Sequence, residues 1–301
     1  MKRGWITWDK AELPPEAFET RLASVRQHLA ERELPALVVY SDVWKSNHGR
    51  YFTNFMPYWN RALVVLPRES PPMLLCALSP RVYPWIRSVT ILDEIRPSPN
   101  LAQQLLQMCS EKGWRRIGVL DLARLPHDLH MLICAGEVEV VDVPAVVVRK
   151  SPDPWELAMY RRAATLARQV LAEELPQGVG MVDHEFAGRL ERRFRRAGAE
   201  DLVILVTNGE TPPVPARGAV LGEDFSVSLA LEYRGHWVKL ARSVRTIHSE
   251  APAHKENLYG AYPYEAGTGP IFALYIEGQA NGRRLFYGDT YWRGRKGDEL
   301  L

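Results

Sequence analysis

The first half of the chain alternates between short apolar runs and longer amphipathic segments. Residues 15–33 place Phe18, Leu22, Val25 and Leu29 three and four positions apart, which predicts a helix with one apolar face. Short apolar runs bounded by polar residues, Gly or Pro predict buried strands. We expect strands at 36–41, 61–67, 71–78, 115–121 and 137–144, and further helices at 100–113 and 127–136. This alternation predicts an α/β domain with a mixed sheet over residues 1–148.

The pattern changes in the second half of the chain. Two prolines punctuate residues 146–156, where Ser151 or Asp153 is available to cap a following helix. Two amphipathic helices are expected at 154–175 and 183–197, followed by strand-like segments up to the C-terminus. A helix pair followed by β-structure predicts a second, α+β domain over residues 149–301.

Residues 221–243 have the alternation of a β-hairpin, with a Tyr-Arg-Gly turn between two strands. The return strand carries Lys239 and Arg242 where a half-buried strand would favour uncharged side chains. Lys239 either pairs with Glu232 or another nearby acid, or extends from an edge of the sheet into water.

The composition is that of an ordinary globular protein, with 46% hydrophobic and 25% charged residues. The net charge of +2 gives no bulk electrostatic reason to expect a nucleic acid or a membrane surface as a partner. The arginines of 189–198 are interpreted as the solvated face of a helix, because Leu190, Phe194 and Ala197 recur at helical spacing.

Three further features bear on location and cofactors. Cys76, Cys109 and Cys134 are far apart and surrounded by apolar residues, so we interpret them as reduced core residues. The first residues lack the apolar run of a signal peptide, and no stretch approaches the roughly 20 apolar residues that cross a bilayer. We therefore expect a cytoplasmic protein without membrane partners and without a cofactor.

The order of several short motifs resembles the creatinase, prolidase and aminopeptidase P family. These motifs are YFTNF (51–55), RKSPDPWELAMYRRAATLA (149–167), TNG (207–209) and the LGED hairpin that starts at 221. The resemblance extends in order over almost the whole chain. It implies a creatinase-like N-terminal α/β domain and a shortened, α+β pita-bread C-terminal domain.

The resemblance also gives four positions to metal ligands, and none of them carries a carboxylate. These positions are Ser228, Lys239, Tyr275 and Gly288. Only 26 residues separate Arg242 from Gly269, and the block that carries the family's ligand histidine has no counterpart there. An ammonium group repels a divalent cation, so metal-dependent peptidase activity by this chain alone is not expected.

A metal-independent enzyme is the alternative. In that reading Lys239 and Arg242 bind the carboxylate of a small amidino, amide or amino-acid-like molecule, and His236 or Glu232 transfers protons. The competing interpretation of His236 is an exposed turn histidine without a carboxylate partner. His248 and His254 are assigned to a polar loop that replaces the missing block.

Residues 47–62 combine aromatic rings with arginines, a composition typical of interfaces and of carboxylate-binding walls. Tyr51, Phe52 and Phe55 are interpreted as rings buried at the end of a core strand. The candidates for an interface or a pocket wall are Arg50, Tyr58, Trp59 and Arg61.

In dimers of the resembled family, this N-domain segment leans over the partner's site. The leading hypothesis is therefore a non-catalytic pseudoenzyme or accessory subunit, paired with itself or with a metal-bearing homologue.

Overall fold

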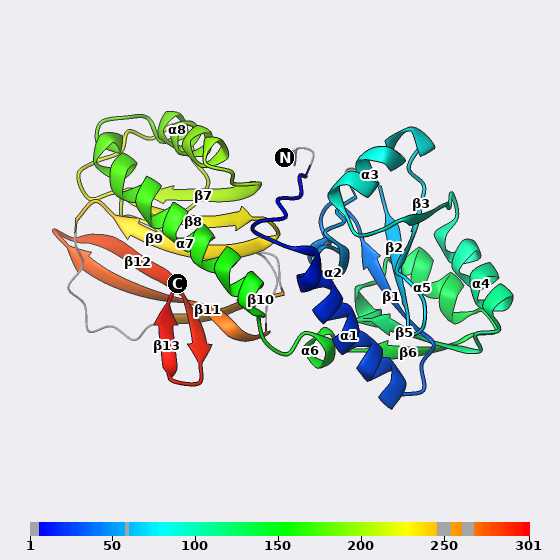
Figure 1. Ribbon diagram of the computed structural model, residues 1–301. Coiled ribbons are helices and arrows are strands. Elements are labelled where there is room, and N and C mark those ends of the chain that lie inside the picture. Colours follow the sequence, from blue (N-terminus) through cyan, green and yellow to red (C-terminus); the bar gives the residue numbers. More distant parts are fainter. Residues whose placement is uncertain (1–5, 58–59, 246–253, 261–267) are drawn as a thin grey trace. The chain divides into compact units, whose positions relative to one another are not determined.

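A computed structural model of the chain describes residues 6–57, 60–245, 254–260 and 268–301. Contacts divide the chain into two compact units, Met1–Lys150 and Ser151–Leu301, each with its own sheet (Figure 1). Among the described helices, none combines the length and the hydropathy needed to cross a membrane.

The first unit is built on a six-stranded mixed sheet in the order β4-β3-β2-β1-β5-β6. Its strands are β1 (Ala36–Ser41), β2 (Ala62–Pro67), β3 (Met73–Cys76), β4 (Glu94–Pro97), β5 (Arg116–Leu120) and β6 (Glu139–Val143). Its helices are α1 (Pro15–Glu31), α2 (Asn47–Thr53), α3 (Tyr83–Val89), α4 (Leu101–Lys112), α5 (His127–Cys134) and α6 (Ala145–Val148), with 3-10 turns at Pro80–Val82 and Leu122–Arg124. The central strand β1 is antiparallel to β2 and parallel to β5, which gives the predicted mixed α/β sheet.

Both faces of this sheet are covered. Successive residues of β1 enter two different cores, because side chains alternate across a strand. Leu37 and Val39 pack in the core that includes α1, α2 and α3, whereas Ala36 and Val38 pack in the core that includes α4 and α5. Burial on both faces explains why the first four residues of β1 are all apolar instead of alternating with polar ones.

The segment after β1 is a helix, so the predicted strand end at Tyr51 and Phe52 is wrong. Phe52 and Phe55 are buried as expected, but they are held by α2 and the turn that follows it. Gly49 lets this helix lie against β1, since a Cβ there would come within 2.9 Å of Ser41 Oγ. Asn54 ends the helix in the left-handed conformation, at φ 60°, which asparagine tolerates.

The second unit consists of an antiparallel sheet and two helices. The sheet has the order β10-β11-β12-β9-β8-β7, with β13 paired to β12. Its strands are β7 (Asp201–Thr207), β8 (Ser226–Tyr233), β9 (His236–Ser243), β10 (His254–Tyr259), β11 (Thr268–Ala280), β12 (Arg283–Gly294) and β13 (Gly297–Leu300). The helices are α7 (Pro154–Glu174) and α8 (Asp183–Arg196), with a 3-10 turn at Leu175–Gly178.

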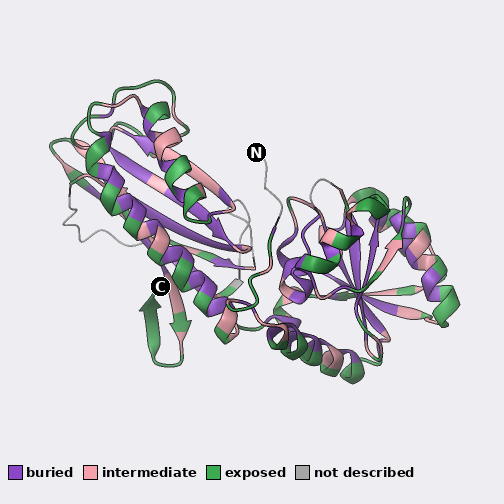
Figure 2. Ribbon diagram, turned by 45° about the horizontal axis from the view of Figure 1, so that its top comes forward, coloured by how far each residue is buried: buried purple, intermediate pink, exposed green. Residues whose placement is uncertain are grey.

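One face of this second sheet packs against the helices. α7 presents a stripe of buried positions, visible in Figure 2, to β8 and β9. The core joins Tyr160 and Phe186 of the helices to Val227, Leu229 and Leu240 of the hairpin. The mixed sheet of the first unit and the antiparallel sheet of the second match the predicted α/β and α+β classes.

Two sequence-based expectations fail in detail. The segment assigned to a polar loop contains strand β10, which begins at His254 and pairs with β11. His248 lies outside the described residues. Cys76 and Cys109 are buried as expected, whereas Cys134 is exposed at the end of α5.

Candidate functional site

Strand register in the second unit brings three of the candidate positions into one row across the sheet. Ser228 lies opposite Ala241, Ala241 opposite Gly288, and Gly288 opposite Tyr275. Residues that face each other across strands point to the same side of a sheet. The candidates from β8, β11 and β12 therefore lie on one face, although up to 60 residues of sequence separate them.

A second row, next to the first, contains Lys239. This residue lies opposite Ala230, and its backbone N–H donates to Thr290 Oγ1 on β12 at 2.9 Å. Thr290 lies opposite Ala273, and Ala273 opposite Glu256 on β10. The two rows thus place Lys239 and Glu256 on the same face as Ser228 and Tyr275.

These two rows line a cavity of about 300 Å³. Its polar side chains are Ser228, Lys239, Glu256 and Tyr275, and its apolar walls are Val203, Leu205, Leu229 and Ala230. Apolar walls with a few convergent polar groups are typical of ligand sites.

Lys239 and Glu256 form an ion pair in the cavity. Lys239 is only 9% exposed, whereas the Glu256 side chain is 30% exposed and remains in contact with water. Burial, together with the negative charge of Glu256, raises the pKa of the Tyr275 phenol, which is therefore neutral at physiological pH. The paired charges cancel, so the cavity offers neither a free ammonium nor a free carboxylate.

Tyr275 and Gly288 fit together as a complementary pair. A Cβ placed on Gly288 would lie 2.4 Å from Tyr275 Cδ1, closer than two carbon atoms can approach. The tyrosine ring therefore covers the glycine and fills the space that a side chain at position 288 would occupy. These two positions depend on each other sterically.

Arg242 and Lys239 do not share a cleft. They are three residues apart on β9, and an odd separation places side chains on opposite faces of a strand. Arg242 instead binds both carboxylate oxygens of Asp289, at 2.9 and 2.8 Å, and Asp289 is 1% exposed. Arg168 of α7 lies 3.8 Å from the same carboxylate. The predicted carboxylate clamp made by Lys239 and Arg242 is therefore wrong.

His236 lies on the same face of β9 as Arg242, which is the face that packs against α7 and is called the helix face below. It has the carboxylate partner that the sequence did not reveal. It is buried, and its Nε2 lies 3.5 Å from Glu156 Oε1. Glu156 is itself fully buried and accepts a hydrogen bond of 2.9 Å from the Tyr259 hydroxyl. The interpretation of His236 as an exposed turn residue is wrong.

One role of Glu156, in capping the helix α7, can be recognised from the sequence. Asp153 and Glu156 form a reciprocal capping box at the start of α7, with Asp153 Oδ1 accepting from the Glu156 N–H at 2.8 Å. Sequence predicts the cap, but not that the same glutamate faces a histidine 80 positions later. Glu256 had no such signal, since its segment was expected to be a loop.

Glu232 lies on the same face of the hairpin as Lys239, opposite Trp237, and is buried. It does not line the cavity. The four catalytic candidates therefore divide between the two faces of the hairpin, with Lys239 and Glu232 on one and His236 and Arg242 on the other, and only Lys239 borders the cavity.

The two described interface candidates of the first unit differ in their exposure. Arg50 is buried in α2, whereas Arg61 is exposed and binds Asp128 of α5 through two hydrogen bonds of 2.9 and 2.8 Å. Tyr58 and Trp59 lie outside the described residues. The guanidinium of Arg61 already has a carboxylate partner within its own unit.

α2 also contributes to a buried polar cluster. His48 Nε2 lies 3.5 Å from Asp121 Oδ2, and His48 Nδ1 lies 3.3 Å from Arg149 Nη1. Burial lowers the pKa of His48 to about 4 and outweighs the hydrogen bond to Asp121, which acts in the opposite direction. Arg149 also stacks on the ring of Tyr51, 4.3 Å from its centroid. The histidine is therefore neutral at physiological pH.

The side chains at the four resemblance-derived metal positions do not fit a dinuclear metal centre. Two hard cations a few ångströms apart need several carboxylate or imidazole ligands. The four positions provide a hydroxyl, an ammonium, a phenol and no side chain, and the nearby carboxylate of Glu256 is paired with Lys239. Across the described part of the chain, no group of three or more His, Cys, Asp or Glu side chains is arranged to hold a metal ion.

Comparison with solved structures finds the same fold in Xaa-Pro peptidases. An X-Pro aminopeptidase from Thermotoga maritima has a TM-score of 0.73 at 14% identity, covering 93% of this chain and 96% of that chain. A prolidase from Pyrococcus horikoshii has a TM-score of 0.71 at 12% identity, covering 93% and 97%. A variant of Escherichia coli aminopeptidase P has a TM-score of 0.69 at 12% identity, covering 98% and 95%.

The chain therefore has the two-domain pita-bread peptidase fold, as its sequence predicted. At the level of sequence, no family model matches the chain. No curated protein matches it either.

Proposed function

We propose that the chain is a non-catalytic pseudoenzyme or accessory subunit with the pita-bread fold. It acts by pairing with itself or with a metal-bearing homologue. The observation that carries this proposal is the cavity of the second unit, where Lys239 pairs with Glu256 and Tyr275 covers Gly288.

The contents of that cavity are mutually adjusted. Loss of metal ligands by drift alone would leave unpaired charges or empty space, both of which are unfavourable in an interior. Here the ammonium has a carboxylate partner, and the bulky phenol faces a residue without a side chain. This supports a cavity that is maintained without metal.

The fold around the cavity remains complete enough to present surfaces to a partner. The sheet, both helices and the α7 capping box are in place. Such packing can persist when catalytic groups change, because stability and chemistry depend on different residues. A chain of this kind retains the means to associate with a relative after its own chemistry has been lost.

The metal half of the proposal is tested by titrating the purified chain with Mn²⁺ and Zn²⁺ in a calorimeter, together with an assay of Xaa-Pro dipeptide hydrolysis. We expect no stoichiometric binding and no hydrolysis. A Lys239→Ala variant serves as a control for repulsion by the ammonium alone, and it is expected to remain inactive because the carboxylates are still missing. A tightly bound metal, with hydrolysis that a chelator abolishes, would overturn the proposal.

The association half is tested by native mass spectrometry and by a tagged pull-down from the source cells at natural expression. We expect either a homodimer or a stoichiometric complex with a pita-bread homologue that carries the Asp, His and Glu ligands. A chain that stays monomeric at micromolar concentration and captures no such homologue would contradict this half. The two measurements are independent, so each half can fail alone.

A further inference from the structure

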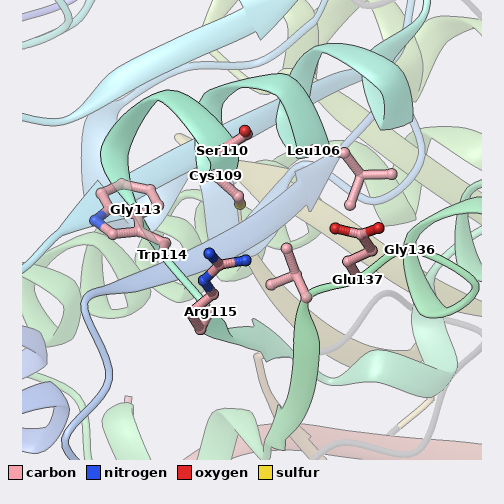
Figure 3. A pocket seen from close by; sticks show the side chains of 9 residues that line it. Leu106, Cys109, Ser110, Gly113, Trp114, Arg115, Gly136 and Glu137 are labelled. Carbon is pink, nitrogen blue, oxygen red and sulfur yellow. The ribbon is translucent and has the colours of Figure 1, made fainter.

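A second cavity lies in the first unit, at the amino ends of β5 and β6. It has a volume of about 340 Å³, within the range of small-molecule sites (Figure 3). The end of α4 and the turn that follows α5 enclose it. Its apolar surface comes from Leu106, Trp114 and Val138, and Arg115 and Glu137 stand at its rim.

The local backbone explains how these side chains meet. Gly113 ends α4 in the left-handed conformation, and the Trp114 N–H donates to the Cys109 carbonyl at 2.8 Å. This cap turns the chain so that Trp114 and Arg115 follow directly at the rim. On the other side Gly136 packs against Leu106, since a Cβ there would lie 2.6 Å from Leu106 Cδ2. Glu137 is thereby brought to the same cavity.

Among the residues that the structure describes, the two charges at the rim have no partner. In the described part of the chain, neither Arg115 nor Glu137 makes an ion pair or a side-chain hydrogen bond, with each other or with other residues. The neighbouring pair behaves differently: Arg116 and Glu139 lie opposite each other in the sheet and form an ion pair of 3.0 Å. Figure 3 shows the guanidinium of Arg115 and the carboxylate of Glu137 both turned toward α4.

We propose that this cavity binds a small zwitterion with an apolar side chain, such as a free aliphatic amino acid. The ligand carboxylate would bind the planar guanidinium of Arg115, which suits bidentate contact. The ligand ammonium would bind Glu137, and the side chain would lie against Leu106, Val138 and the indole of Trp114. A purely anionic or cationic ligand would satisfy one rim charge and be repelled by the other. This proposal concerns a different unit from the metal-free cavity and does not depend on it.

The test compares three probes by calorimetry or ligand-observed NMR. L-leucine carries both charges, L-leucinamide lacks the carboxylate, and N-acetyl-L-leucine lacks the ammonium. We expect saturable binding of L-leucine with a dissociation constant near 1 mM, and binding of each blocked analogue at least tenfold weaker, which corresponds to the loss of one charge contact.

Variants then assign each charge to its residue. Arg115→Gln is expected to weaken L-leucine about tenfold without changing the weak binding of leucinamide. Glu137→Gln should do the same to L-leucine and leave N-acetyl-leucine unchanged. Arg116→Gln and Glu139→Gln, the adjacent paired residues, are the matched controls and should change nothing. Equal binding of all three probes, or no saturable binding of L-leucine up to about 10 mM, overturns the proposal.

Discussion

The two faces of strand β9 each carry an ion pair, and the carboxylates of these two pairs differ in their exposure to water. On the face that packs against the helices, Arg242 donates two hydrogen bonds to the carboxylate of Asp289, which is 1% exposed. On the opposite face of the same strand, Lys239 pairs with Glu256 beside a cavity, and that glutamate is 30% exposed. The carboxylate of the first pair therefore lies in a dry layer and that of the second beside open space, whereas the side chains of Arg242 and Lys239 are 17% and 11% exposed.

This difference teaches which charges hold the fold and which were free to change. A buried ion whose partner is removed has no water to replace it, so its pairing is fixed by stability. A charge beside a cavity can be solvated, so its residue type can change at little cost. Charges on the helix face of β9 are thus needed for the fold. On the opposite face, which borders the cavity and is called the open face below, residues can change and function can be gained or lost.

The largest effect is expected from Asp289→Ala, which leaves the guanidinium of Arg242, whose side chain is only 17% exposed, without its carboxylate. The loss should be about 3–5 kcal/mol in the free energy of unfolding, measured by urea denaturation. Asp289→Leu combined with Arg242→Met removes both charges and should recover most of the loss. As a surface control, Asp298→Ala breaks the exposed pair with Arg293 and should leave the urea midpoint unchanged. If Asp289→Ala costs under about 1 kcal/mol, the dry-layer interpretation is wrong.

His48 tests the same idea in the first unit, through pH. Its folded-state pKa of about 4 lies below the unfolded value of 6.5, so the unfolded chain takes up a proton first as the pH falls. Its contribution to stability is complete above pH 6.5 and is lost between pH 6.5 and 4, by about 3 kcal/mol in total.

An NMR titration of the His48 ring gives the folded pKa directly, and urea unfolding at pH 7 and 5 gives the loss of stability. His48→Gln should flatten the pH dependence in this window. His184→Gln, at an exposed histidine, should leave it unchanged. A His48 ring that titrates near 6.5 would contradict the prediction.

The steric dependence between Tyr275 and Gly288 is tested by Gly288→Ala. The new Cβ would meet the Tyr275 ring at 2.4 Å, and overpacking of this kind costs about 1–3 kcal/mol. Tyr275→Ser in the same chain should remove the clash, so the double variant should be more stable than the sum of the two single changes predicts. Strict additivity in this double-mutant cycle would show that the ring does not cover the glycine.

Much of the fold follows from sequence pattern, and its failures have physical causes. The helix at 15–31 was predicted from its strong periodicity, and β1 from its short run of apolar residues. α2 was missed because its tyrosine and its phenylalanine favour strands by propensity, whereas the close approach of Gly49 to Ser41 of β1 is a tertiary contact. β10 was missed because its sequence is polar and does not indicate a strand, and because its pairing partner β11 is a separate segment of the chain.

The candidate site shows the same division. The shared cleft expected for Lys239, Arg242 and His236 was wrong, because a separation of three residues on β9 turns Lys239 away from both of the others. The partners of these residues were not predictable, since Glu156, Glu256 and Asp289 come from other elements. Sequence determines the face of a strand, and the three-dimensional fold determines what lies on it.

The smallest effect is expected from Lys239→Met, and its small size is the sharpest test of the comparison. Removal of the ammonium leaves Glu256, but this carboxylate is partly exposed beside the cavity and can bind water. The free energy of unfolding should change by at most about 1 kcal/mol, and Lys239→Met combined with Glu256→Gln should give the same value. Urea denaturation beside Asp289→Ala makes the two faces directly comparable. If Lys239→Met costs as much as Asp289→Ala, the open face is as dry as the helix face, and its lysine is held by stability alone.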